Sequence, residues 1–151
     1  MRTLRRIALA GLGALLPVLA ACSGFYPPDQ PDWIVNRIPL RSCGEEGAEQ
    51  GVGATNVDAR RCLLAAYDAG EGAELISTRP TEEGDPVTTY YRVHENGTVE
   101  IFVDATRDRF GGQRWSRYRC DRLAPADDVN PDLANEERVF IEQGCQELPI
   151  P

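Results

Sequence analysis

The chain has 151 residues, of which 42% are hydrophobic and 26% are charged, and its formal net charge at pH 7 is −8. This length and composition are typical of one folded domain with a single core. The acidic balance argues against nucleic acid or an anionic membrane surface as the main partner.

Residues 1–22 follow the order of a bacterial export signal that ends in a lipid-attachment site. Three arginines precede an apolar run over residues 7–19, and Leu-Ala-Ala-Cys over residues 19–22 forms a lipobox. The run is too short and too interrupted by Gly and Pro to span a bilayer by itself. We therefore expect residues 1–21 to be removed and Cys22 to carry palmitate, which would anchor the protein at the extracytoplasmic face of the bacterial cell membrane. The alternatives are an ordinary secretory signal with a chance cysteine, or an uncleaved anchor.

A tether and one domain are expected after the signal. Residues 22–32 are rich in Pro and polar side chains, which predicts an extended, lipid-anchored linker. We find no internal repeat and no second domain, so residues 33–151 are expected to form a single α+β domain.

Four further cysteines remain in this domain: Cys43, Cys62, Cys120 and Cys145. In an exported domain an even number of cysteines predicts disulfides, here two. A Cys₄ zinc site is the competing interpretation, but no two of these cysteines have the C-x₂₋₄-C spacing of such sites. We favour Cys43–Cys62 and Cys120–Cys145 among the possible pairings, because Cys43 and Cys62 flank one loop in the N-terminal third.

The strongest helical pattern covers residues 56–69. Thr55 or Asn56 is suited to cap its start, and Gly70 is suited to end it in the left-handed conformation. Apolar side chains lie on one face at helical spacing and charged ones lie away from it. The helix is therefore expected to pack by one side only.

An alternating pattern follows and predicts four strands, over residues 73–78, 87–94, 98–104 and 115–122. Asn96-Gly97 marks a hairpin between the second and third of them. A two-residue turn would mix charged and apolar side chains on both faces. A three-residue loop with Gly97 in a bulge pairs Val93 with Val99 and separates an apolar face from a polar one, so we favour this register.

These elements predict an α+β fold in the order α-β-β-β-β, with one helix packed on a four-stranded antiparallel meander and two disulfides. Pro125 and Asn130-Pro131 interrupt the chain beyond the last of these strands. Residues 138–142 are either a short strand or the last turn of a helix, and we favour the strand.

Three motifs within residues 57–123 carry a resemblance to a known family. They read Glu83-Gly84-Asp85-Pro86-Val87, then Asp104-x-Thr106-Arg107-Asp108-x-Phe110-Gly111-Gly112, then Cys120. In these motifs the chain resembles a family of uncharacterised bacterial lipoprotein domains, catalogued as a domain of unknown function. The resemblance implies an exported, lipid-anchored α+β domain, and it implies no activity, substrate or catalytic residue.

Aspartates at the predicted strand ends are candidates for metal binding or acid–base chemistry. Asp104, Thr106 and Asp108 place oxygens at alternate positions, as a calcium loop does, but Arg109 stands where that loop needs glycine. The favoured interpretation is a tight turn in which the aspartates accept hydrogen bonds from backbone amides. Asp85 could face Asp104 for acid–base work, although Gly-Asp-Pro is also ordinary turn sequence. A hydrolase or metal-binding domain that uses Asp85, Asp104 and Asp108 is thus the alternative function.

An arginine-rich stretch is the main basic feature of this acidic chain. The strand pattern places several of its residues on one sheet face, together with aromatic side chains: Tyr90, Arg92, Trp115, Arg117 and Arg119. Such side chains bind carboxylates, phosphates or an acidic protein surface. Pairing of these arginines with the chain's own acids is the alternative, because cross-strand ion pairs are common.

Known catalytic patterns do not predict an enzyme. The sequence has no G-x-S-x-G, H-E-x-x-H or phosphate-loop motif, and its single histidine, His94, is expected to be solvated near the hairpin turn. We therefore expect a non-catalytic binding module without a cofactor, whose partner is an envelope protein or an anionic ligand.

Overall fold

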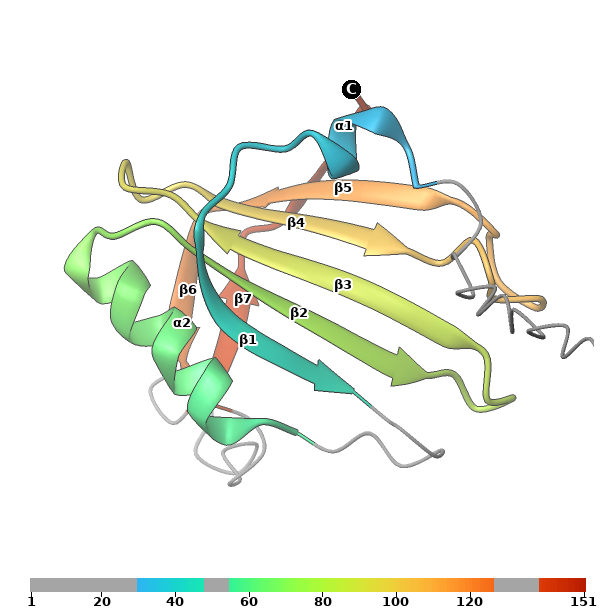
Figure 1. The fold of residues 1–151 in the computed structure, drawn as a ribbon, viewed down its shortest axis with the longest axis horizontal. Coiled ribbons are helices and arrows are strands. Elements are labelled where there is room, and N and C mark those ends of the chain that lie inside the picture. The colour runs from blue at the N-terminus through green and yellow to red at the C-terminus, as the bar shows by residue number, and fades with distance from the viewer. Residues whose placement is uncertain (1–29, 48–54, 127–138) are drawn as a thin grey trace, which may run out of the picture. The chain divides into compact units, whose positions relative to one another are not determined.

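The computed structural model describes residues 30–47, 55–126 and 139–151 (Figure 1). Within these ranges the chain forms two helices and eight strands: α1 (Asp32–Val35), β1 (Arg41–Gly47), α2 (Val57–Ala69), β2 (Ala73–Pro80), β3 (Pro86–Val93), β4 (Val99–Asp104), β5 (Trp115–Cys120), β6 (Arg122–Pro125), β7 (Phe140–Gln143) and β8 (Gln146–Leu148). Contacts divide the chain after Val35, and all the strands belong to the second unit. No helix in the described ranges is long and apolar enough to span a membrane.

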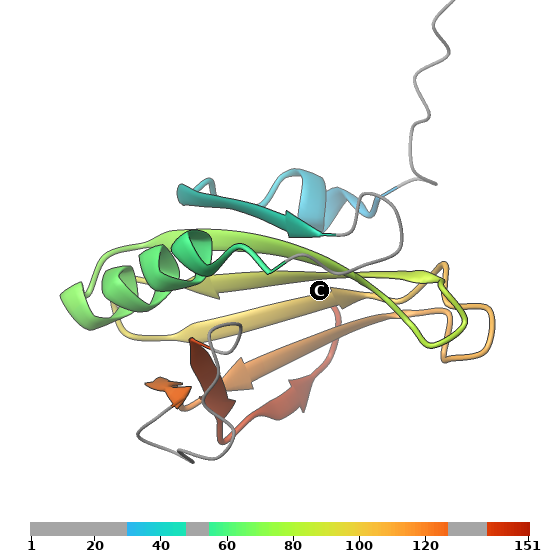
Figure 2. The same ribbon diagram turned by 90° about the horizontal axis from the view of Figure 1, so that it is seen from below.

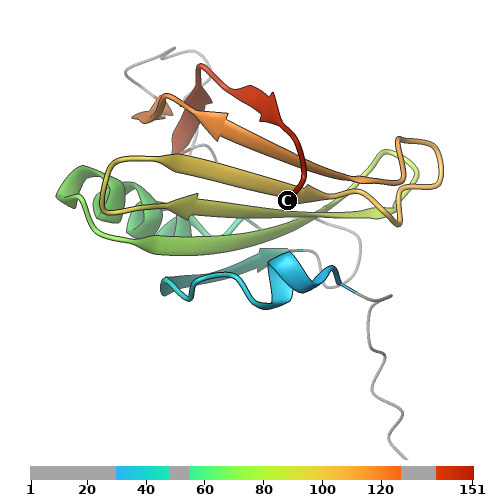
Figure 3. The same cartoon turned by 90° about the horizontal axis from the view of Figure 1, so that it is seen from above.

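Six strands form one mixed, curled sheet in the order β1-β2-β3-β4-β5-β8 (Figure 2). β1 runs parallel to β2, and every other neighbouring pair is antiparallel. The parallel pair is possible because α2 lies between β1 and β2 in the chain and provides the crossover that parallel strands need. β6 and β7 form a separate antiparallel pair (Figure 3).

The predicted fold class is wrong, because the protein is mostly β and not one helix on a four-stranded meander. The sequence pattern missed three strands: β6 of the separate pair, and β1 and β8 at the two edges of the six-stranded sheet. β1 contains Gly44 at φ +105° and a register shift between Ser42 and Gly44, which remove the alternating pattern. β8 has only three residues, and two of them are exposed polar side chains.

The helix prediction is confirmed in its position and in both of its ends. The Asn56 side chain accepts a hydrogen bond from the Ala59 backbone N–H at 3.0 Å, as an N-cap residue does. Gly70 ends α2 at φ +66°, a left-handed conformation that glycine adopts without strain from a Cβ atom.

The bulged hairpin register is also confirmed. Val93 pairs with Val99 across β3 and β4, and the His94 backbone N–H donates to the Thr98 carbonyl at 3.0 Å. Gly97 has φ +78°, in the left-handed region that this loop requires. Odd-numbered positions of both strands therefore share one face of the sheet.

The core lies on this odd-numbered face, between the sheet, α2, β6 and β7. Its fully buried members include Leu63 from α2, Leu75 from β2, and Val93 and Val99 from the hairpin. Phe140 of β7 is buried there too, which confirms a strand in the C-terminal segment, although residue 138 lies outside the described ranges.

Both predicted disulfides are present. Cys43 and Cys62 connect β1 to α2, and Cys120 and Cys145 connect the end of β5 to the residue before β8. Each bridge therefore fixes one edge strand of the six-stranded sheet to a neighbouring element.

Candidate functional site

The five side chains predicted to bind a ligand share the sheet face opposite the core. The register aligns Arg92 with Glu100 and then with Arg119 across β3, β4 and β5. In the next row Tyr90 is aligned with Phe102 and Arg117, and in the row after that Asp104 is aligned with Trp115. We call this surface the polar face.

The centre of the polar face is closed. Tyr90 and Arg92 are 5% and 4% exposed, and Trp115 stacks on Tyr90 with a centroid separation of 6.0 Å. Residues that precede β1 contribute to this burial, because the Arg37 guanidinium lies 5.1 Å from the centroid of the Tyr90 ring. In addition, Arg92 Nη2 donates a hydrogen bond to the Ile38 carbonyl. The side chains of Tyr90 and Arg92 are therefore buried beneath the polar face, where they pack against other residues of the chain.

Glu74 forms ion pairs with two arginines at this closed centre. Arg37 donates two hydrogen bonds to its carboxylate, at 2.7 and 2.6 Å. Arg92 Nε lies 2.9 Å from Glu74 Oε2, although this N–H has no hydrogen-bond partner of suitable geometry. The hydrogen bond to Glu74 raises the pKa of Arg37, whereas burial lowers the pKa of Arg92 despite the neighbouring carboxylates.

Glu100 of β4 has a similar role on the other side of β3. Arg117 donates to Glu100 Oε1 at 2.9 and 2.7 Å. Arg92 Nη1 lies 3.6 Å from its other oxygen, and His94 Nε2 lies 3.4 Å from that oxygen. For Arg92 and Arg117, the structure thus agrees with the interpretation in which the arginines pair with the chain's own acids.

Arg119 differs from the other arginines of the polar face. Its side chain is exposed, and it forms no ion pair with any residue that the structure describes. It lines an open hollow of about 230 Å³ together with His94, Asn96, Thr98 and Glu100. We call this hollow the Arg119 pocket.

Most of the Arg119 pocket could not be predicted from sequence motifs, which indicated a solvated His94 and no role for Asn96 or Thr98. The signal was present in the hairpin register, which places His94, Thr98 and Glu100 on the same face as Arg119. Guanidinium, imidazole, amide and hydroxyl groups together are suited to bind a carboxylate or phosphate.

The aspartates of the alternative function serve as acceptors in turns. Asp85 is buried, and it accepts hydrogen bonds from the backbone N–H of Arg109 at 2.9 Å and from its Nε at 2.9 and 3.1 Å. Asp104 accepts from Thr106, and Asp108 accepts from the backbone N–H groups of two of the next three residues. The described part of the chain contains no group of three or more His, Cys, Asp or Glu side chains that could hold a metal ion.

Cys22, the predicted lipid-attachment residue, lies outside the described residues.

Comparisons with protein-family models, with curated proteins and with solved structures found no match. The likeness to uncharacterised bacterial lipoprotein domains therefore remains a prediction that depends on the motifs quoted above.

Proposed function

We propose that this chain is a lipid-anchored, extracytoplasmic binding module of a bacterial envelope, and that it binds an anionic group in the Arg119 pocket. The order of charge, apolar run, small residues and Cys22 supports the anchor. Two disulfides support an oxidising compartment, because such bonds are rarely maintained in the cytoplasm of mesophiles.

One observation carries the proposed binding activity: Arg119 is exposed without an ion pair among the described residues, whereas the nearby Arg92 and Arg117 have carboxylate partners. Among the described residues that line the pocket, Glu100 is the single acid, and its carboxylate already contacts those two arginines. The pocket therefore has a local positive charge in a chain of net charge −8.

The size of the pocket limits the ligand. A volume of about 230 Å³ is smaller than the ~300–1,000 Å³ of sites for drug-sized molecules. The pocket therefore fits a single carboxylate or phosphate group, either on a small molecule or at the end of an acidic side chain of a partner.

Titration with inorganic phosphate and with acetate tests the pocket. In ¹H–¹⁵N spectra of the full chain, we expect saturable shifts at His94, Asn96 and Thr98, with the stronger response identifying the anion. Arg119→Gln should weaken binding roughly ten- to hundredfold, because a charge-assisted hydrogen bond contributes ~1.5–3 kcal/mol.

Arg107→Gln is the matched control, because Arg107 is also exposed and forms no ion pair with the described residues. It should leave the titration unchanged. If both variants lost anion affinity equally, or if chemical-shift changes were spread over the whole surface, the response would reflect charge screening. Either result would contradict a defined pocket.

The anchor is tested separately from the pocket. Labelling with palmitate should mark the wild-type chain and not the Cys22→Ala variant, and the variant should leave the membrane fraction. Wild-type protein without label would contradict the anchor and would leave the pocket titration unaffected.

A further inference from the structure

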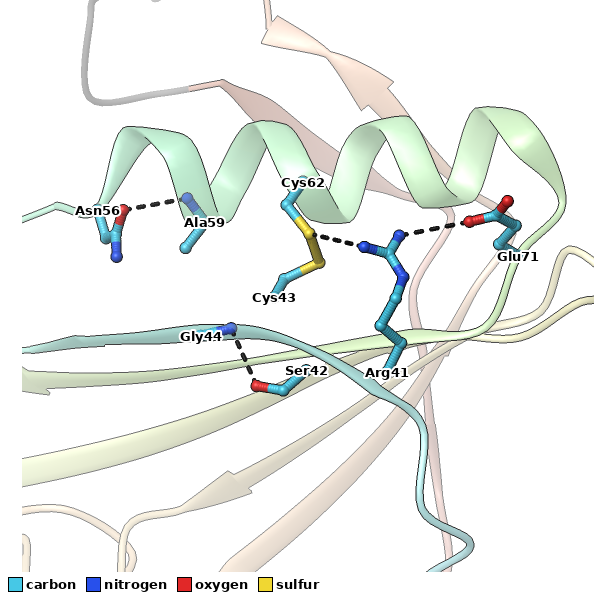
Figure 4. Close-up of a disulfide and its surroundings, with 8 residues drawn as sticks. All are labelled: Arg41, Ser42, Cys43, Gly44, Asn56, Ala59, Cys62 and Glu71. Carbon is cyan, nitrogen blue, oxygen red and sulfur yellow. Dashed lines mark hydrogen bonds and ion pairs between the residues drawn. A yellow bond between two sulfur atoms is a disulfide. The ribbon is translucent and has the colours of Figure 1, made fainter.

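The Cys43–Cys62 disulfide has a cation in contact with one of its two sulfur atoms (Figure 4). Arg41 Nη1 donates a hydrogen bond to Cys62 Sγ at 3.4 Å. The second terminal nitrogen of Arg41 lies 3.4 Å from Glu71 Oε2, so the guanidinium bridges the disulfide and a carboxylate. Both cysteines are partly exposed.

A guanidinium in this position changes the chemistry of the bond. A nearby positive charge stabilises a thiolate relative to the thiol, and a disulfide breaks faster when its leaving sulfur is the better-stabilised thiolate. Because Arg41 contacts Cys62 and not Cys43, the two sulfur atoms are not equivalent. Cys62 is the better leaving group, and Cys43 is the sulfur that an incoming thiolate attacks.

We propose that Cys43–Cys62 is a redox-active disulfide that exchanges with an external dithiol, with Arg41 stabilising Cys62 as the leaving thiolate. The proposal is independent of the function assigned to the Arg119 pocket.

The exchange balances in two steps. A thiolate of the dithiol attacks Cys43 Sγ, the bond between Cys43 and Cys62 breaks, and its electron pair stays on Cys62 Sγ next to Arg41. The second thiol of the reductant loses its proton and attacks the reductant's own sulfur in the mixed disulfide, which releases Cys43. The dithiol is thereby oxidised to a disulfide, and Cys43 and Cys62 are reduced.

The Cys120–Cys145 disulfide has the opposite surroundings. Cys145 is exposed, but Cys120 is 3% exposed, and none of the described residues donates a hydrogen bond to either sulfur atom of this bridge. The carboxylate of Asp121 packs against Gly144, since a Cβ there would lie 2.1 Å from Asp121 Oδ2. Asp121 follows Cys120 in the chain and packs against the residue before Cys145, and a negative charge in this position disfavours thiolates, so this bridge is expected to exchange slowly.

Other contacts hold β1 in place when its disulfide opens. β1 is hydrogen-bonded in parallel to β2, a contact that does not involve the disulfide. Arg60 of α2 also forms a buried ion pair with Glu46 of β1. Reduction at Cys43 and Cys62 should therefore be a local event that leaves the sheet folded.

Two substitutions test the proposal in opposite directions. In the full chain treated with dithiothreitol, reduction is measured by alkylation and peptide mapping, which score each cysteine separately from Cys22. Arg41→Gln should slow reduction of Cys43–Cys62 on the order of threefold, the change expected for one pKa unit at a sulfur. Glu71→Gln should accelerate it, because Arg41 then loses a competing carboxylate.

Arg41 and Glu71 have side chains that are 51% and 63% exposed, so neither substitution should disturb folding. Cys120–Cys145 is the internal control, and its rate should be slower and unaffected by both changes. Equal rates for the two bridges, no slowing in Arg41→Gln, or slowing in Glu71→Gln would each overturn the proposal.

Discussion

Glu46 shows how a single charged residue is accommodated inside this fold. Its side chain is 1% exposed, and its carboxylate accepts hydrogen bonds from Arg60 Nε at 3.0 and 2.9 Å. Arg79 adds a second cation at 3.5 Å. Burial by itself raises the pKa of Glu46, but hydrogen bonds from Arg60 and Ser77 and the charge of Arg60 outweigh it and lower this pKa.

Glu46→Gln should destabilise the protein by about 3–5 kcal/mol at pH 7, because it leaves the buried Arg60 without its counter-charge. A lowered pKa in the folded state means that the stabilisation from Glu46 is present above the unfolded pKa, about 4.3, and is lost as the pH falls through the folded value. The difference between wild type and variant should therefore shrink below about pH 4. Urea unfolding at pH 7 and pH 3 measures it.

Glu147→Gln provides the control at an exposed position. Glu147 pairs with Arg114 at 3.4 Å, and both side chains are more than half exposed. Such a pair contributes less than about 1 kcal/mol. Similar losses in the two variants, or a loss for Glu46→Gln that does not depend on pH, would contradict the assigned role of the buried pair.

At the scale of elements, the β3–β4 hairpin depends on the conformation of Gly97. A Cβ atom at this position would meet nothing within 4 Å, so only the φ of +78° disfavours other residues. Gly97→Ala should therefore cost about 1 kcal/mol of stability, and Gly97→Asn should cost less. Gly112→Ala is the control, because Gly112 lies in an exposed loop without a positive φ and its Cβ would come no closer than 3.5 Å to Arg114. Equal effects of the two alanine substitutions would contradict the bulged turn.

Elements that depend on neighbouring residues could be predicted from the sequence, and those that depend on distant ones could not. The cap at Asn56, the stop at Gly70 and the register at Val93 and Val99 are each determined by local patterns, and all three are confirmed. The edge strand β1 lacks an alternating pattern, and it forms because β2, Cys62 and Arg60 hold it. The interactions that form β1 therefore come from residues far away in the chain, and the local sequence does not predict the strand.

The candidate site shows the same division. Strand alternation correctly placed Arg92, Arg117 and Arg119 on one face, because the period of a strand is a local property. It did not show which of them would be buried. Burial of Arg92 involves Ile38, which precedes β1 and contacts the face across more than fifty positions of sequence. Only the three-dimensional structure therefore identifies Arg119 as the exposed arginine.

At the scale of the whole molecule, the two disulfides restrain separate parts of the chain. Cys43–Cys62 closes a segment with a sequence separation of 19, and Cys120–Cys145 closes one of 25. The two segments do not overlap, and each includes or adjoins an edge strand that has little apolar burial of its own. The restraints therefore act on the unfolded chain independently.

Removing both bridges should make the fold marginal. Replacing either cysteine pair by alanine should cost about 3 kcal/mol, because loops of this length lose similar closure entropy. Losses in the free energy of unfolding add when the sites are independent, so the quadruple variant should lose about 6 kcal/mol. This loss is comparable to the whole free energy of unfolding of a typical domain, ~5–15 kcal/mol. Urea unfolding followed by circular dichroism compares the wild type with the two paired variants and the quadruple variant. A quadruple variant that unfolds at the wild-type urea concentration would show that the sheet is stable without its bridges, and it would remove the link between this fold and an oxidising compartment.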